Sequence, residues 1–202
     1  MYIKLGRVRI HIGFPFAAFC AFAANSRLGE SLTLVFVSAL LHEAGHAAVL
    51  LGLGDRSLTL FLSPGGARIE SRLSGALPYK NDIAAAAAGP LVNIAIAAGA
   101  AMLFSATGGE RFIRAAEANI ALGAVNLLPM TFLDGGRILS DILLLHMSEN
   151  RARRICSVCG GAVFFVLCAV CAYLTSAGEN TLFLAVFLVY CTLQKTACWH
   201  LK

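Results

Sequence analysis

The chain has 202 residues, a net charge of +5 and only 13% charged residues. Soluble domains carry about 25% charged residues, and the mean hydropathy of +0.77 together with several long apolar runs is typical of a protein that crosses the membrane repeatedly. The basic residues lie at the ends of these runs, so they indicate membrane topology rather than a surface for nucleic acid. The composition therefore excludes a sizeable water-soluble domain, and no nucleic-acid partner is expected.

Six membrane spans are predicted, which makes the chain an all-α polytopic membrane protein. The expected spans are residues 12–24, 31–53, 83–106, 112–145 with an interruption at 129–136, 155–175 and 181–198. A single domain over residues 1–202 is expected, because the connections between the spans are short.

The longest connection, residues 54–81, has a different pattern from the rest of the chain. Two short runs of alternating polar and apolar residues, 57–63 and 67–72, flank the turn Pro64-Gly65-Gly66. This pattern predicts a β-hairpin between the second and third spans. An isolated hairpin is only marginally stable, so we expect it to pack on the membrane domain.

The distribution of basic residues predicts the orientation in the membrane. An even number of spans places both termini on one side, and that side would carry twelve Lys and Arg residues, against three on the opposite side. Basic residues accumulate on the cytoplasmic side of membrane proteins. Both termini and the hairpin are therefore expected in the cytoplasm.

Two Cys-x-x-Cys pairs lie in the fifth predicted span, Cys156 with Cys159 and Cys168 with Cys171. Such pairs can hold a metal or form disulfides. Within a helix of lipid-spanning length, however, cysteine behaves as a small apolar residue. We therefore expect these cysteines to serve packing.

The segment His42-Glu43-Ala44-Gly45-His46 places three ionisable side chains in the second predicted span. Residues four apart share one face of a helix, so both imidazoles can bind one metal ion while Glu43 lies beside it as a general base. An acid at the centre of a membrane helix costs about 2.5–3.5 kcal/mol on insertion scales and is retained where it has partners and a function. The pattern therefore favours a metal site over a polar cluster that only joins helices.

A catalytic zinc site has three protein ligands and an open position for water. The other histidines and Glu70 lie near chain ends, at span ends or in the hairpin, so the candidates for the third ligand are Asp134 and Asp141. Asp134 follows Pro129 in an interrupted helix at membrane depth, where irregular backbone is tolerated if it lines a wet cavity. Asp134 is therefore the predicted ligand, and Asp141 is expected to pair with Arg137 four residues earlier.

Three motifs in this order resemble the site-2 protease family (peptidase family M50) of intramembrane metalloproteases. They are His42-Glu43-x-x-His46, Ala88-Gly89-Pro90-x-x-Asn93 and Asn126-x-x-Pro129-x-x-x-x-Asp134-Gly135. The resemblance covers roughly residues 9–200. It implies a metalloendopeptidase that hydrolyses a peptide bond in or near a membrane segment, with one Zn²⁺ held by His42, His46 and Asp134 and with Glu43 as the general base.

The resemblance also implies roles for two asparagines. Asn126 would stand near the zinc and position the substrate or stabilise the oxyanion, although an asparagine that caps a broken helix is the alternative. For Asn93 a catalytic role and a hydrogen bond between helices are equally favoured.

Within the family, the segment from Phe61 to Glu70 is similar to proteases that activate a sporulation sigma factor. The expected partners are the bilayer of a bacterial cell membrane and a membrane-associated pro-sigma factor; the alternative substrate is a single-span anti-sigma factor or a remnant signal peptide. An inhibitory membrane partner and a homo-oligomer stay open, and residues 1–202 are expected to contain neither a CBS nor a PDZ domain.

Two interpretations without catalysis were weighed. A metal transporter would need further acids or histidines along a path through the membrane, and the chain has few. An inactive substrate-binding relative would be expected to lose Glu43 or a ligand, and all four residues are present. We therefore predict an active enzyme.

Overall fold

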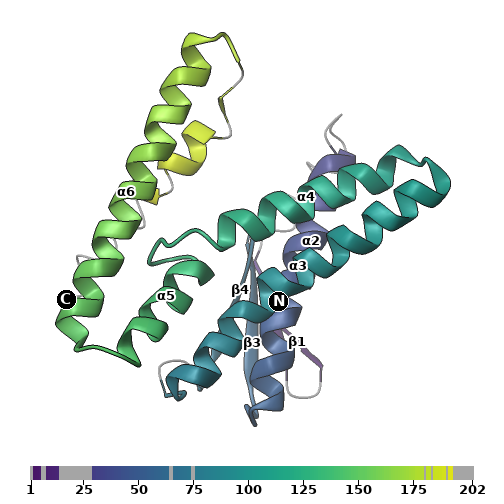
Figure 1. Cartoon of the computed structure of the whole chain (residues 1–202). Helices are drawn as coiled ribbons and strands as arrows, with labels where there is room; N and C mark the ends of the chain where they lie inside the picture. Colours follow the sequence, from purple (N-terminus) through teal and green to yellow (C-terminus); the bar gives the residue numbers. More distant parts are fainter. Residues whose placement is uncertain are drawn as a thin grey trace. The chain divides into compact units, whose positions relative to one another are not determined.

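The computed structural model describes residues 2–5, 8–13, 29–63, 66–73, 76–179, 181–182, 184–189 and 191–192. The chain divides into two compact units, Met1–Leu127 and Leu128–Lys202. In its described part the first unit contains a sheet and three helices, and two helices of 11 and 28 residues make up most of the described part of the second (Figure 1).

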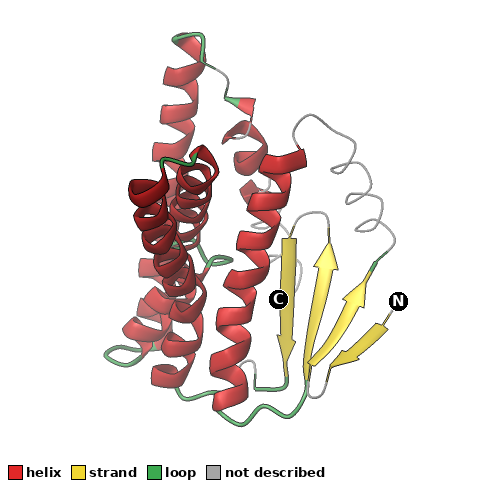
Figure 2. Cartoon of the chain, turned by 90° about the vertical axis from the view of Figure 1, so that its right-hand side faces the viewer, coloured by secondary structure: helices red, strands yellow, loops and turns green. Residues whose placement is uncertain are grey.

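The sheet has four strands in the order β1-β2-β3-β4, which Figure 2 shows side by side. The strands are β1 (Tyr2–Leu5), β2 (Val8–Ile12), β3 (Leu58–Ser63) and β4 (Gly66–Ser71). The predicted hairpin is confirmed, since β3 and β4 pair antiparallel. The sequence did not predict β1 and β2, which pair with each other and add to β3 through a parallel β2–β3 contact. The first predicted span was placed from Ile12, but this residue ends β2; residues 14–24 lie outside the described part of the chain.

Successive residues of a strand point to opposite faces, and one face of strands β2 to β4 is largely apolar. One face carries the cross-strand neighbours Leu60 and Ile69, and the other carries Thr59 and Glu70. Leu58, on the apolar face, is only 1% exposed and forms a small core with residues of the two helices that follow β2 and β4 in the chain. The sheet is therefore attached to the helices through its apolar face.

The described helices of the first unit are α2 (Gly29–Gly52), α3 (Tyr79–Thr107) and α4 (Glu110–Asn126). Helices α2 and α3 approach closely where Gly45 meets α3, since a Cβ on Gly45 would lie 2.8 Å from the carbonyl oxygen of Ala88. Small residues allow this spacing in membrane helices. Helix α4 is joined to α2 by a buried hydrogen bond, in which Asn119 Nδ2 donates to Ser38 Oγ at 2.9 Å.

The second unit contains α5 (Asp134–Leu144) and α6 (Glu149–Ser176). The predicted interruption of the fourth span is confirmed, because α4 ends at Asn126 and regular helix resumes only at Asp134. The intervening segment folds tightly onto the first turn of α5: a Cβ on Gly136 would lie 2.0 Å from the carbonyl oxygen of Met130. Residue 136 therefore has to be glycine for this turn to form.

Three helices of the described chain, α2, α3 and α6, are long and apolar enough to cross a membrane. They support a membrane location for the protein. The six-span arrangement stays a prediction: α4 has 17 residues, and of the sixth predicted span the structure describes only parts, in which residues 184–189 are helical.

Candidate metal centre

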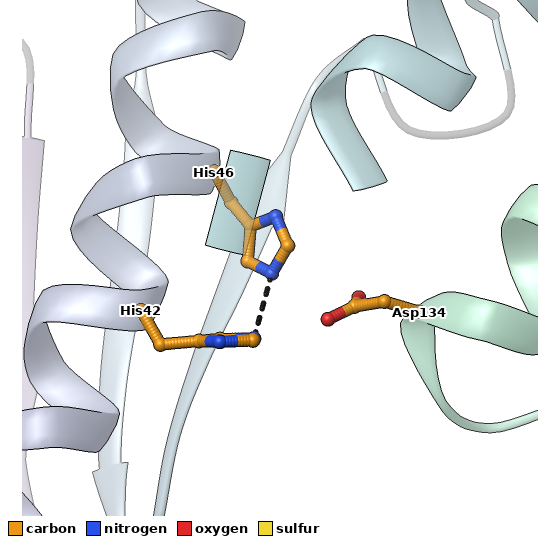
Figure 3. A group of neighbouring side chains, drawn as sticks. All are labelled: His42, His46 and Asp134. Carbon is orange, nitrogen blue, oxygen red and sulfur yellow. Dashed lines mark hydrogen bonds between the residues drawn. The ribbon is translucent and has the colours of Figure 1, made fainter. Parts of the chain in front are cut away.

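Two histidines of α2 form the centre of the site. His42 and His46 lie one helical turn apart and are 4% and 9% exposed. Their Nε2 atoms face each other at 3.1 Å (Figure 3). The helix therefore brings the two imidazoles together as the four-residue spacing predicts.

The hydrogen bonds of the two Nδ1 atoms indicate which nitrogen of each ring is available to bind a metal ion. His46 Nδ1 lies 2.7 Å from the carbonyl oxygen of Ala85, and His42 Nδ1 lies 3.0 Å from Oδ1 of Asn93. A carbonyl oxygen only accepts, so each Nδ1 carries the hydrogen and each neutral ring presents a lone pair at Nε2. Two lone pairs at this distance repel each other, whereas a cation between them would bind both. The pair is therefore suited to a metal ion.

Gly89 of α3 provides the space that an ion needs. A Cβ on residue 89 would lie 2.4 Å from His46 Nε2 and 2.6 Å from His42 Nε2. Any other residue type would place a carbon atom against both nitrogen atoms. In the sequence, Gly89 belongs to the motif Ala88-Gly89-Pro90-x-x-Asn93. The signal for its functional role is a glycine in the middle of an apolar span, which is often a site of close approach.

Asp134 is the first residue of α5 and is partly buried. His42, His46 and Asp134 each offer one ligand atom, and these atoms lie within 4.8 Å of one another (Figure 3). Two imidazoles and a carboxylate are a donor set of catalytic zinc sites. The chemistry of these three residues therefore fits zinc. Asp141, the alternative ligand, is buried within α5, and Asp134 as the third ligand stays a prediction.

The structure places the other predicted site residues as follows. Glu43 is partly buried and follows His42 on α2, about 100° around the helix axis. Asn93 is completely buried and contacts His42, as described above. Asn126 is the last residue of α4, and its Nδ2 donates to the carbonyl oxygen of Leu122 at 3.0 Å. This bond lies within the last turn of α4 and fits either role, so a contact of Asn126 with substrate and a capping role both stay predictions.

The chain is similar to several known proteases. The model of peptidase family M50 matches residues 110–168. Stage IV sporulation protein FB of Bacillus subtilis is 31% identical over 148 residues, which are 68% of this chain and 51% of that protein. A zinc metalloprotease of Methanocaldococcus jannaschii is 29% identical over 142 residues, which are 66% of this chain and 40% of that protein. The chain thus spans about half or less of the length of these relatives.

A solved structure shows the same fold. The Site-2 Protease from Methanocaldococcus jannaschii matches with a TM-score of 0.65 and 24% sequence identity, over 94% of this chain and 91% of that one. The matched residues include parts of both units of the present chain.

Proposed function

Because the chain belongs to peptidase family M50, we propose that it is an intramembrane zinc metalloprotease that hydrolyses a peptide bond in or near a membrane segment of its substrate. The observation that carries this proposal is the pair of facing Nε2 atoms of His42 and His46 beside the bare backbone of Gly89. A buried pair of this kind is suited to a metal cation, and Asp134 would complete a set of three ligands.

The mechanism assigns one task to each side chain. His42, His46 and Asp134 would hold the zinc, which when bound polarises the scissile carbonyl and lowers the pKa of a water to about 7. Glu43 takes the proton from the attacking water and delivers it to the leaving amine. The hydrogen bonds from Nδ1 of His42 and His46 keep both rings in the orientation in which Nε2 faces the ion.

The substrate must be unwound before it is cut, because a helical segment hides its carbonyl groups in its own hydrogen bonds. Strand β4 is an end strand in the order of the sheet, and an extended segment can add to such an edge through main-chain hydrogen bonds. We infer that the substrate is held in this way. The edge lies in the unit that also contains Glu43.

For the substrate we favour a membrane-associated pro-sigma factor, cut on the cytoplasmic side. The similarity to Stage IV sporulation protein FB supports this choice, and the basic residues around the hairpin support the side of cleavage. A single-span anti-sigma factor or a remnant signal peptide is the alternative. Co-expression with a sporulation pro-sigma factor is expected to yield a shorter product. Cleavage of a trimmed anti-sigma factor, with the pro-sigma factor left intact, would favour the alternative.

Three variants test the enzymatic proposal itself. Glu43→Gln is expected to keep about one zinc per chain and to lose cleavage, because the glutamine cannot take a proton. His46→Ala and Asp134→Asn are expected to lose both zinc and cleavage, because each removes a ligand. Zinc is measured by elemental analysis of the purified protein. Cleavage by Glu43→Gln at the rate of the unchanged protein would refute the mechanism.

A further inference from the structure

An apolar pocket of about 300 Å³ lies between α2 and the apolar face of the sheet, and Glu43 is part of its wall. Among the described residues that line this pocket, Glu43 alone is charged. The volume is at the lower end of the range of about 300–1,000 Å³ found for ligand sites, and it can hold one large apolar side chain. A pocket that adjoins the proposed general base is suited to bind part of the substrate.

The wall on α2 combines three alanines with Leu40 and Leu51. Ala44, Ala47 and Ala48 follow Glu43 at spacings that place all four residues on one face of the helix. Ala44 and Ala48 are exposed, so the floor of the pocket is accessible. His42 and His46 project from a neighbouring face, where they contact α3. Glu43 thus lies at the border between the histidine face and the pocket.

The opposite wall comes from the sheet. Leu60 of β3 and Ile69 of β4 are direct cross-strand neighbours and both line the pocket. Their strands carry Thr59 and Glu70 on the other face, so the sheet turns an apolar surface to α2. An occupant of this pocket therefore contacts methyl and methylene groups on both sides and a single carboxylate.

We propose that this pocket is a specificity subsite, which binds a large apolar side chain of the substrate, such as leucine or phenylalanine, next to the scissile peptide bond. The proposal rests on the proposed protease function, because Glu43 connects the pocket to the reaction. Glu43, Ala48 and Leu60 line the same pocket, so a side chain bound there belongs to a substrate residue close to the proposed general base. The selected occupant is apolar, because burying a charge against this lining of methyl and methylene groups carries a large desolvation cost.

A pocket-filling substitution tests the subsite through substrate preference. The probes are model peptides that span the membrane once and consist of leucine and alanine with a central Gly-Pro break in the helix. In each series, one position near the cleavage site is varied and carries Ala, Leu or Phe. At one position the unchanged protein is expected to cleave the Phe or Leu peptide at least tenfold faster than the Ala peptide, since pocket contacts of this size change rates by about 10–200-fold. Ala48→Leu is expected to abolish this preference while zinc content stays the same.

Control variants separate the pocket from general damage. Ala98→Leu adds the same volume at an exposed position of α3 away from the pocket, and it is expected to keep the preference. Ala44→Leu fills the pocket one turn from Ala48 and is expected to act as Ala48→Leu does. Unchanged preference in both pocket variants would overturn the proposal.

Crosslinking provides a readout that does not need catalysis. A photoreactive benzoylphenylalanine at residue 48 of a Glu43→Gln chain is expected to crosslink the Phe model peptide, and the same group at residue 98 is not. If the peptide crosslinks at residue 48 but the protein with Glu43 intact cleaves no peptide, the binding pocket is supported and the protease function is refuted. If the protein cleaves the peptides, but residue 48 does not crosslink and the pocket variants keep the preference for Phe or Leu, the pocket is refuted and the protease function is not. A crosslink only to lipid, or to another segment of this chain, would identify a different occupant and also overturn the proposal.

Discussion

A Cβ atom on Gly89 would lie 2.4 Å from Nε2 of His46, in the space that faces both imidazoles. The backbone of α3 therefore forms one wall of the candidate metal centre without contributing a side chain. Gly45 allows α2 to pack closely against this wall. A Cβ on residue 45 would lie 2.8 Å from the carbonyl oxygen of Ala88 and would push the two helices apart. The metal centre thus depends on glycines of two helices as well as on its ligands.

Gly89→Ala is expected to abolish zinc binding. The added methyl group would occupy the space beside both Nε2 atoms, so the zinc content of the purified protein should fall from about one per chain to below roughly 0.1. Gly99→Ala is the matched control, since this glycine of the same helix has nothing within 4 Å of its Cβ position. Both changes raise the helix propensity by up to about 1 kcal/mol, so a difference between them reports the contact of the added methyl group with the two imidazoles. Stoichiometric zinc in Gly89→Ala would show that the ion binds elsewhere.

The six-span topology predicts on which side of the membrane each of four fused reporters lies. Fusions after Ser71 and at the carboxy terminus are expected to report the cytoplasm, because the basic residues gather on that side. Fusions after Gly109, between α3 and α4, and after Gly178, beyond the end of α6, are expected to report the opposite side. The measurement uses paired reporters that are active on only one side of the membrane. A cytoplasmic signal at Gly178 would contradict six spans.

Asp55 attaches the hairpin to the end of α2 and is 2% exposed. Burial alone would raise the pKa of this carboxyl, but hydrogen bonds from the Ser71 hydroxyl and from the backbone N–H groups of Ser57, Leu73 and Arg72 hold the pKa below its ordinary value of 3.8. A carboxyl with a lowered pKa in the folded state stabilises the protein fully above the pKa of the unfolded state. This stabilisation is lost as the pH falls through the pKa of the folded state.

Asp55→Asn is therefore expected to lower the thermal stability of the detergent-solubilised protein at pH 7. Loss of the charged acceptor should cost roughly 1–3 kcal/mol. Acidification from pH 4 towards pH 2 should destabilise the unchanged protein more than the variant, because the variant has no carboxyl to protonate at this position. Glu179→Gln removes an exposed carboxylate beyond the end of α6 and serves as the control. Equal stability of Asp55→Asn and the unchanged protein at pH 7 would show that the contact contributes nothing.

Local sequence patterns predicted the structural relationships between residues that are near each other in the sequence. The pairing of His42 with His46 follows from the helical period, and the β3–β4 hairpin follows from alternation around a glycine-rich turn. The parallel pairing of β2 with β3 could not be predicted in this way, because Ile10 and Leu60 are neighbours only in the folded chain. Gly89 was missed as a functional residue for the same reason, since its role depends on how closely α3 approaches α2.

Asn93 is expected to act as a positioning residue for His42. Its Oδ1 accepts the hydrogen of His42 Nδ1 at 3.0 Å, and this bond leaves the lone pair of Nε2 available to the metal. Removing such a partner of a metal-bound histidine typically weakens metal affinity by about 10–100-fold. Asn93→Ala should therefore weaken zinc binding by this factor in a chelator competition, while Asn93→Asp, which keeps an acceptor, should restore much of the affinity. Asn119→Ala is the matched control, because Asn119 is also buried but donates to Ser38 of α2 and not to a histidine. If Asn93→Ala and Asn119→Ala bind zinc equally well, Asn93 serves only the packing of α2 against α3.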